Sequence, residues 1–234
     1  LLARNNPPVI EAIRDAFLAL RDTRRRLLAT PHIWMNDALR DIVGGSSSLW
    51  HELLRVTQDV VASIEELVSV ADETRIEFPD STDIRSLFED ARILKEHIEN
   101  GGKLGWGLFR PKPVKERLYV IKTVRIAGCP CSTVEHFSSL ADALYVRIKC
   151  EKAWDFWKGR SEKVEGPYTL QLTALKSLRD TLEKALALEE LIVKCREAVT
   201  QCPSMSEPIW ADESQVESVI SSCRLALARI RKRL

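Results

Sequence analysis

Apolar residues recur at spacings of three and four along almost the whole chain, and this pattern constrains the fold more than any other feature. One example is the near-heptad run of Leu49, Leu53, Val56, Val60, Ile64, Leu67 and Val70. This spacing places one apolar stripe along an α-helix, and such a stripe must be buried against another helix. We find no alternating strand pattern of convincing length, although the β-rich run over residues 118–126 leaves a short strand open. The sequence therefore predicts an all-α protein.

Turn and capping residues divide these stripes into about five long helices and two or three short ones. The expected helices cover residues 7–30, 33–42, 46–77, 83–100, 114–123, 132–159, 169–200 and 212 onward. The pattern Ser132–Glu135 predicts a capping box at the start of one of them. The helix over 169–200 has a phase slip in its middle and would be on the order of 45 Å long. Because short connections favour antiparallel neighbours, we expect an elongated multi-helix bundle with a long antiparallel coiled-coil hairpin.

We expect two segments of one continuous helical domain. Residues 1–128 form a helical bundle with a Gly/Trp/Pro-rich turn at 101–113, and residues 129–234 form the long hairpin plus a C-terminal helix. The chain begins without Met, and its basic end has the pattern of an interrupted helix, so we expect a fragment of a larger protein. No apolar run approaches the roughly 20 residues that span a bilayer, and we expect no membrane partner.

The stretch GGKLGWGLFRPKP, residues 101–113, is the least helical part of the chain and contains four of its nine glycines. Its glycines and prolines end one helix and permit a sharp re-entry into the next. We expect Trp106 and Phe109 to fill this corner of the core and Lys103, Arg110 and Lys112 to remain outside.

Positive charge is concentrated over residues 103–125, which hold seven basic residues and one acidic residue, a net charge of +6. The basic residues are Lys103, Arg110, Lys112, Lys115, Arg117, Lys122 and Arg125. Residues 59–100 carry twelve acidic and four basic residues, a net charge of −8. The two regions can neutralise one another within the fold. Alternatively, the basic residues contact phosphates while aromatic residues stack on bases, or they dock onto other domains of the parent protein.

Trp154 and Trp157 lie three residues apart, on one face of an expected helix. Tryptophan is enriched both in cores and in binding hot spots. We single out these two residues as candidate partner contacts, with core packing as the alternative.

The motifs of common catalytic sites are absent from this chain. It contains no GxxxxGK[ST], HExxH or GxSxG, and its four histidines are scattered. Cys129, Cys131, Cys150 and His136 include the ligand types of a zinc site, but the one-residue gap between the first two cysteines is unusual for zinc. We therefore expect no catalytic residues, no metal and no cofactor.

The chain contains six cysteines, and most occupy apolar positions of the expected helices. In a domain with a large core they are better explained as reduced, packed side chains than as a disulfide framework. This favours a cytoplasmic location.

The order of features over residues 85–200 resembles a known helical module. The turn at Gly101–Pro113, a short helix, a second turn at residues 128–131 and the capped segment STVEHF are followed by a long hairpin. This order is similar to the helical, coiled-coil insertion of large bacterial superfamily 1 helicase-like ATPases of the AAA type. The resemblance covers none of that family's catalytic motifs, which are absent from this chain.

The resemblance implies a non-catalytic accessory domain of a nucleic-acid-dependent ATPase or helicase. Such a domain would be a rigid arm that contacts nucleic acid (DNA or RNA), a protein partner or the remainder of the parent ATPase. The alternative from a different class is a cytoplasmic coiled-coil scaffold that binds proteins and has no relation to nucleic acid. Steep salt dependence of DNA binding would separate the two.

Overall fold

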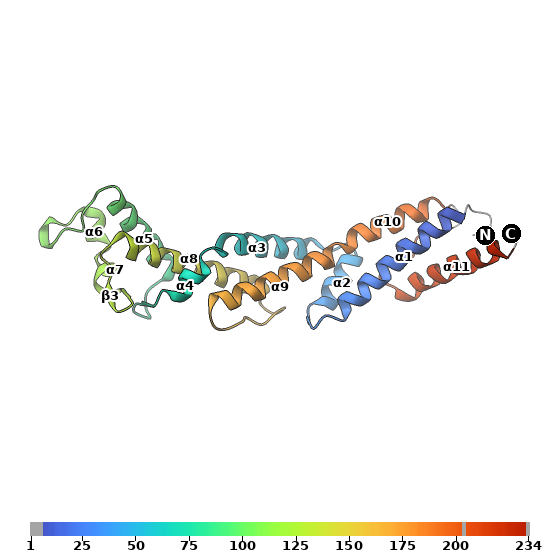
Figure 1. The fold of residues 1–234 in the computed structure, drawn as a ribbon, viewed down its shortest axis with the longest axis horizontal. Helices are drawn as coiled ribbons and strands as arrows, with labels where there is room; N and C mark the ends of the chain where they lie inside the picture. Colours follow the sequence, from blue (N-terminus) through green and yellow to red (C-terminus); the bar gives the residue numbers. More distant parts are fainter. Residues whose placement is uncertain (1–6, 203–204, 233–234) are drawn as a thin grey trace. The chain divides into compact units, whose positions relative to one another are not determined.

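A computed structural model describes residues 7–202 and 205–232, and these residues are mostly helical, as the periodicity predicts (Figure 1). The chain divides into two compact units. Unit 1 comprises the residues up to Arg55 together with those from Leu178 onward, and unit 2 comprises Val56–Ser177. The division that we expected, at residue 128, falls inside unit 2. The reason is that helices from both sides of residue 128 share one core there.

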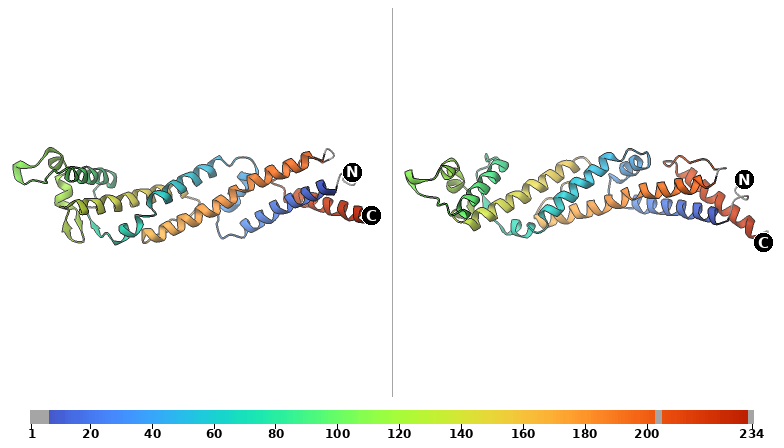
Figure 2. Two further views of the ribbon diagram at one scale, coloured as in Figure 1. Left: turned by 45° about the horizontal axis from the view of Figure 1, so that its top comes forward. Right: turned by 90° about the horizontal axis from the view of Figure 1, so that it is seen from above.

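Unit 1 is built around α1 (Pro7–Leu28), which lies beside α10 (Leu188–Thr200) and α11 (Glu213–Arg231) in every view (Figures 1 and 2). The stripe of α1 that includes Ile10, Ile13 and Phe17 is fully buried. The short helix α2 (Met35–Val43) packs against both α1 and α10. The remaining elements of unit 1 are the first part of α3 (Ser48–Ile64) and the last part of α9 (Tyr168–Leu186).

Unit 2 has its core between α5 (Ile84–Glu99) and α8 (Val134–Trp157), which pack side by side. Leu87, Leu94, Phe137 and Leu140 are completely buried in this core. Smaller elements cover it. They are α4 (Val68–Glu73), α6 (Lys112–Glu116) and α7 (Leu118–Thr123), whereas the 3₁₀ helix η2 (Gly107–Phe109) lies in the exposed loop between α5 and α6.

Unit 2 also contains a small antiparallel sheet of three two-residue strands in the order β1–β2–β3. These are β1 (Ile76–Glu77), β2 (Arg125–Ile126) and β3 (Cys129–Pro130). Ala127 and Gly128 link β2 to β3 with φ angles of 48° and 80°. Positive φ at both central residues defines a type I′ hairpin turn. The β-rich run over 118–126 is thus split between the helix α7 and the strand β2.

Four expected helix assignments were wrong. The region 114–123 contains two short helices, α6 and α7, in place of one. The region 46–77 contains α3, α4 and β1 in place of one long helix. The region 169–200 is divided at Ala187 into α9 and α10, where Leu186 and Leu188 on either side are both buried. This is the position of the phase slip. At the start of α8 the N-cap is Thr133, whose side chain accepts a hydrogen bond from His136 N at 3.2 Å, and not Ser132.

Candidate functional site

The segment that joins α5 to α6, which we call the tip loop (residues 100–111), projects at the end of unit 2 (Figures 1 and 2). α5 ends in a Schellman motif: Gly101 N donates to Ile98 O and Gly102 N donates to His97 O, both at 2.9 Å. A Cβ atom at Gly102 would lie 2.5 Å from the backbone carbonyl oxygen of His97, which accepts the hydrogen bond of the motif and cannot move aside. This close approach explains why the turn needs glycine.

Two further glycines determine the path of the tip loop on either side of Trp106. Gly105 and Gly107 have φ angles of 60° and 53°, a region that glycine adopts readily and other residues avoid. A Cβ atom at Gly105 would lie 2.8 Å from Phe109 O, so the loop closes tightly on itself. The turn is completed by a hydrogen bond of 3.1 Å from Phe109 N to Trp106 O.

The prediction that Trp106 and Phe109 fill the core was wrong. Trp106 is 76% exposed and Phe109 is 79% exposed. The centroids of the two rings lie 6.0 Å apart, and the ring planes make an angle of 57°. The apolar contacts of this corner come instead from Val114, which is fully buried, and from Leu104, which is partly buried. The two large rings therefore lie outside this corner of the core.

The seven basic residues that the sequence singles out differ in exposure and in partners. Lys103, Lys112, Lys115 and Lys122 are exposed, whereas Arg110, Arg117 and Arg125 are partly buried.

Arg117 has a structural role. Its Nε lies 2.9 Å from Asp90 Oδ1, and the Arg117 side chain is only 18% exposed. The other Asp90 oxygen accepts a hydrogen bond of 2.8 Å from the Tyr119 hydroxyl. Burial is the main cause that raises the pKa of Tyr119 far above its usual range, and the hydrogen bond to the Asp90 carboxylate raises it further. The predicted neutralisation between the acidic and basic regions therefore occurs at Arg117, which we remove from the candidate interface.

Four of the basic side chains have no ion-pair partner: within residues 7–202 and 205–232, no carboxylate forms an ion pair with Lys103, Arg110, Lys115 or Lys122. Lys112 forms only a long ion pair, with its Nζ 3.8 Å from Glu116 Oε1, and the Lys112 side chain is 87% exposed. Arg125 donates to Val124 O at 2.9 Å. Positive charge on the tip loop and on α6 and α7 is thus largely available to an anionic ligand.

Trp154 and Trp157, our candidate partner contacts, belong to the core of unit 2. They are 5% and 0% exposed. Trp154 Nε1 donates to Gln171 Oε1 and Trp157 Nε1 donates to Thr57 Oγ1, each at 3.0 Å. A ring that is buried and hydrogen-bonded presents no surface to another protein, so core packing is correct for both.

The cysteines form neither disulfides nor a metal site among the described residues. Cys129 is exposed, and the other five thiols are buried. No group of three His, Cys, Asp or Glu side chains in the described ranges is arranged to hold a metal ion. Burial raises the pKa of Cys131 to about 11 and that of Cys150 to about 12. These thiols are therefore protonated core residues at neutral pH.

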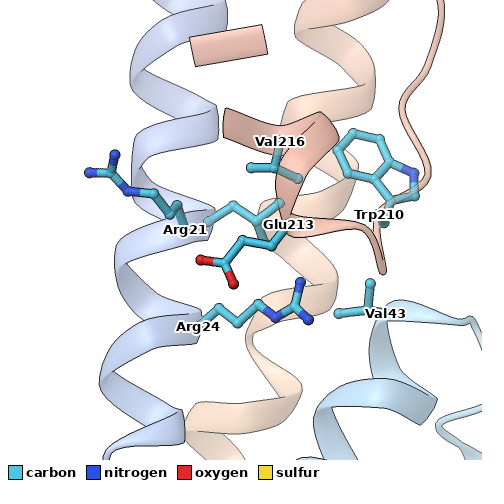
Figure 3. Close-up of a pocket in the computed structure, with 7 residues that line it drawn as sticks. Arg21, Arg24, Val43, Trp210, Glu213 and Val216 are labelled. Atoms are coloured by element: carbon cyan, nitrogen blue, oxygen red, sulfur yellow. The ribbon is translucent and has the colours of Figure 1, made fainter. Parts of the chain in front are cut away.

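A small pocket in unit 1 brings Arg24 close to Trp210 and Glu213 (Figure 3). Arg24 Nη2 donates to Ala211 O at 3.4 Å, whereas its buried Nε has no hydrogen-bond partner in the described part of the chain. The enclosed space measures about 10 Å³. That is room for about one water molecule and far too little for a cofactor.

A larger hollow in unit 2, about 280 Å³, is lined by polar side chains on α8 and on the segment before α9. Its cations already have partners, since Arg147 Nε lies 3.1 Å from Glu151 and Lys163 Nζ lies 3.9 Å from Glu165. We therefore regard the tip loop with α6 and α7, where cations without partners and exposed rings occur together, as the candidate site.

No protein-family model matches this chain, and comparisons with curated proteins and with solved structures give no match. Among the helices described here, none combines the length and the apolar character that crossing a membrane requires.

Proposed function

We propose that this chain is a non-catalytic helical accessory domain of a nucleic-acid-dependent ATPase or helicase, and that it contacts nucleic acid through its basic segment. The observation that carries the binding role is the set of unpartnered cations on the tip loop, α6 and α7, beside two exposed aromatic rings. Lys and Arg side chains that have no partner inside the fold are free to contact the phosphates of a nucleic-acid backbone. The link to an ATPase is supported by the resemblance over residues 85–200.

The interface consists of the basic residues that are not used inside the fold. We assign to it Lys103, Arg110, Lys112, Lys115 and Lys122. Arg125 lies on β2 and contributes charge from the edge of this region. No chemistry is assigned to the domain, and its proposed role is to hold nucleic acid, or a partner domain, for a motor elsewhere in the parent protein.

We also propose that α8 and the first part of α9, both in unit 2, form an antiparallel helical hairpin that serves as the arm of this domain. The connection between α8 and α9 is short, residues 158–167, and Trp154 near its start donates a hydrogen bond to Gln171 just after its end. A short connection with contacts across it favours antiparallel neighbours. The five buried thiols support a cytoplasmic location, where cysteines stay reduced.

The test is equilibrium binding of the whole chain to a single-stranded oligonucleotide at low and moderate salt. If about five cations contact phosphates, affinity should fall about 100-fold between about 50 and 200 mM salt. A variant with Lys103, Lys115 and Lys122 changed to Glu should lose binding.

A matched variant controls for the change in net charge. Lys158, Lys184 and Lys194 are also exposed and lie outside the proposed interface. Changing these three to Glu alters the total charge equally. It should leave the affinity within about threefold, because salt screens the interaction between the ligand and charges outside the interface. Equal loss in both triple variants, or binding that salt does not weaken, would refute the proposal.

The exposed Trp106–Phe109 pair also favours a second candidate, a scaffold that binds proteins and is unrelated to nucleic acid. Aromatic residues are enriched in protein hot spots. This candidate predicts that neither the unchanged chain nor the lysine variants bind nucleic acid.

A further inference from the structure

We infer that the Trp106–Phe109 pair is a stacking platform for unpaired bases, so that the ligand of this site is single-stranded nucleic acid. The inference rests on the proposed nucleic-acid role and specifies its ligand class. The carrying observation is that the two rings are among the most exposed large apolar side chains described in this protein.

The rings are held on a loop whose shape is already determined. The Schellman motif pins its start, and the glycines at 105 and 107 define its path. Its end is anchored by Val114, which is fully buried and whose N–H donates to Pro111 O at 3.1 Å. A loop ordered in advance loses little conformational entropy when a ligand binds.

The geometry of the pair leaves ring faces open. At an interplanar angle of 57° the two rings are tilted, so neither covers the face of the other. With three quarters of each residue exposed, each ring has a free face for a planar group. Nucleic-acid bases are such groups, and stacking on Trp and Phe tolerates any base sequence.

The charges around the rings favour a polyanion. Lys103 precedes Trp106 by three residues, Arg110 follows Phe109 directly, and residues 101–115 contain no Asp or Glu. An acidic peptide would satisfy these cations but would leave the ring faces unused. A duplex would bring phosphates, but its bases are stacked on one another and do not present their faces. A single strand provides both phosphates and free base faces.

Trp106 also supplies the assay. All six tryptophans lie in the described part of the chain, and the other five are at most 9% exposed. Stacking on Trp106 should therefore quench the solvent-exposed part of the intrinsic fluorescence. We would titrate the whole chain with an oligothymidylate of about 10 nucleotides, with a duplex of equal length and with polyglutamate.

The expected result is that oligothymidylate quenches this emission and binds more tightly than the duplex. Trp106→Ala should weaken binding of the single strand about tenfold, measured by anisotropy of a labelled oligonucleotide, and should leave duplex binding unchanged. Trp106→Phe, which keeps a ring, should retain most of the affinity. Phe156, which is 40% exposed on α8, provides the matched control, and Phe156→Ala should bind normally.

The inference is overturned if Trp106→Ala binds the single strand as well as the unchanged chain does, if the duplex binds equally tightly, or if polyglutamate quenches Trp106 with similar affinity. Loss of binding in the lysine variant with no effect of Trp106→Ala would overturn stacking alone and keep the proposed function. Absence of binding in the unchanged chain would overturn both. Far-ultraviolet circular dichroism of each variant establishes that it is folded.

Discussion

Replacement by alanine should strongly destabilise the chain at one tryptophan of unit 2 and have little effect at another. Trp157 is completely buried and donates a hydrogen bond to Thr57 Oγ1 at 3.0 Å. Removing a buried Trp side chain deletes its apolar contacts and leaves a cavity, which costs about 3–5 kcal/mol. We expect Trp157→Ala to lower the free energy of unfolding by this amount.

Trp106 provides the comparison, because the same chemical change there removes little burial. A Trp side chain buries on the order of 200 Å² when fully enclosed. Only about a quarter of Trp106 is covered. At about 25 cal/mol per Å², this corresponds to about 1 kcal/mol at most. Trp106→Ala should therefore leave the stability nearly unchanged.

The measurement is urea unfolding followed by far-ultraviolet circular dichroism, which reports on helix and does not depend on the replaced fluorophore. The free energies are compared only if both variants keep the slope of the unchanged chain. Trp157→Phe, which keeps a ring but removes the N–H donor, should fall between the two alanine variants. Equal destabilisation by Trp106→Ala and Trp157→Ala would refute the burial argument and, with it, the assignment of Trp106 to the interface.

Three further predictions concern the β2–β3 turn and the thiols. Ala127→Gly should stabilise the chain by about 0.5 kcal/mol because it relieves a positive φ, and Gly128→Ala should destabilise it by about 1 kcal/mol, both measured by urea unfolding. Ellman's reagent should modify one thiol per folded chain at once, that of Cys129, and a Cys129→Ser variant should lack this fast phase, whereas fast reaction of several thiols would contradict the burial pattern. The pKa of Cys131 and of Cys150 is raised by burial to about 11 and about 12, so above about pH 8.5 the unfolded chain releases these protons before the folded chain does. Because the folded chain then binds more protons, the urea midpoint should fall as the pH rises toward 11, and Cys150→Ala should make this fall shallower.

The candidate site was only partly predictable from the sequence. The count of basic residues over 103–125 located the charge correctly, because charge depends on residue type alone. Which cations are free depends on where carboxylates end up. Asp90 lies 27 residues before Arg117 in the chain, and only the packing of unit 2 brings the two together.

The aromatic residues show the same limit in both directions. Trp106 was expected inside and is exposed, while Trp157 was offered as a surface contact and is buried. Hydrophobicity indicates that a ring gains by burial, but it does not say whether a core has room. At the tip loop, Val114 and Leu104 occupy the core positions. The glycines on both sides of Trp106 were a usable signal, since residues without side chains build little core around a neighbour.

The sequence by itself determined the helical class, most helix positions and the location of the tip loop, because spacing, caps and glycine conformations are local properties of the chain. The tertiary structure alone decided the division into two units and the partners of each charge. These depend on contacts between residues far apart in sequence, such as the packing of α5 against α8, whose energies no local pattern contains.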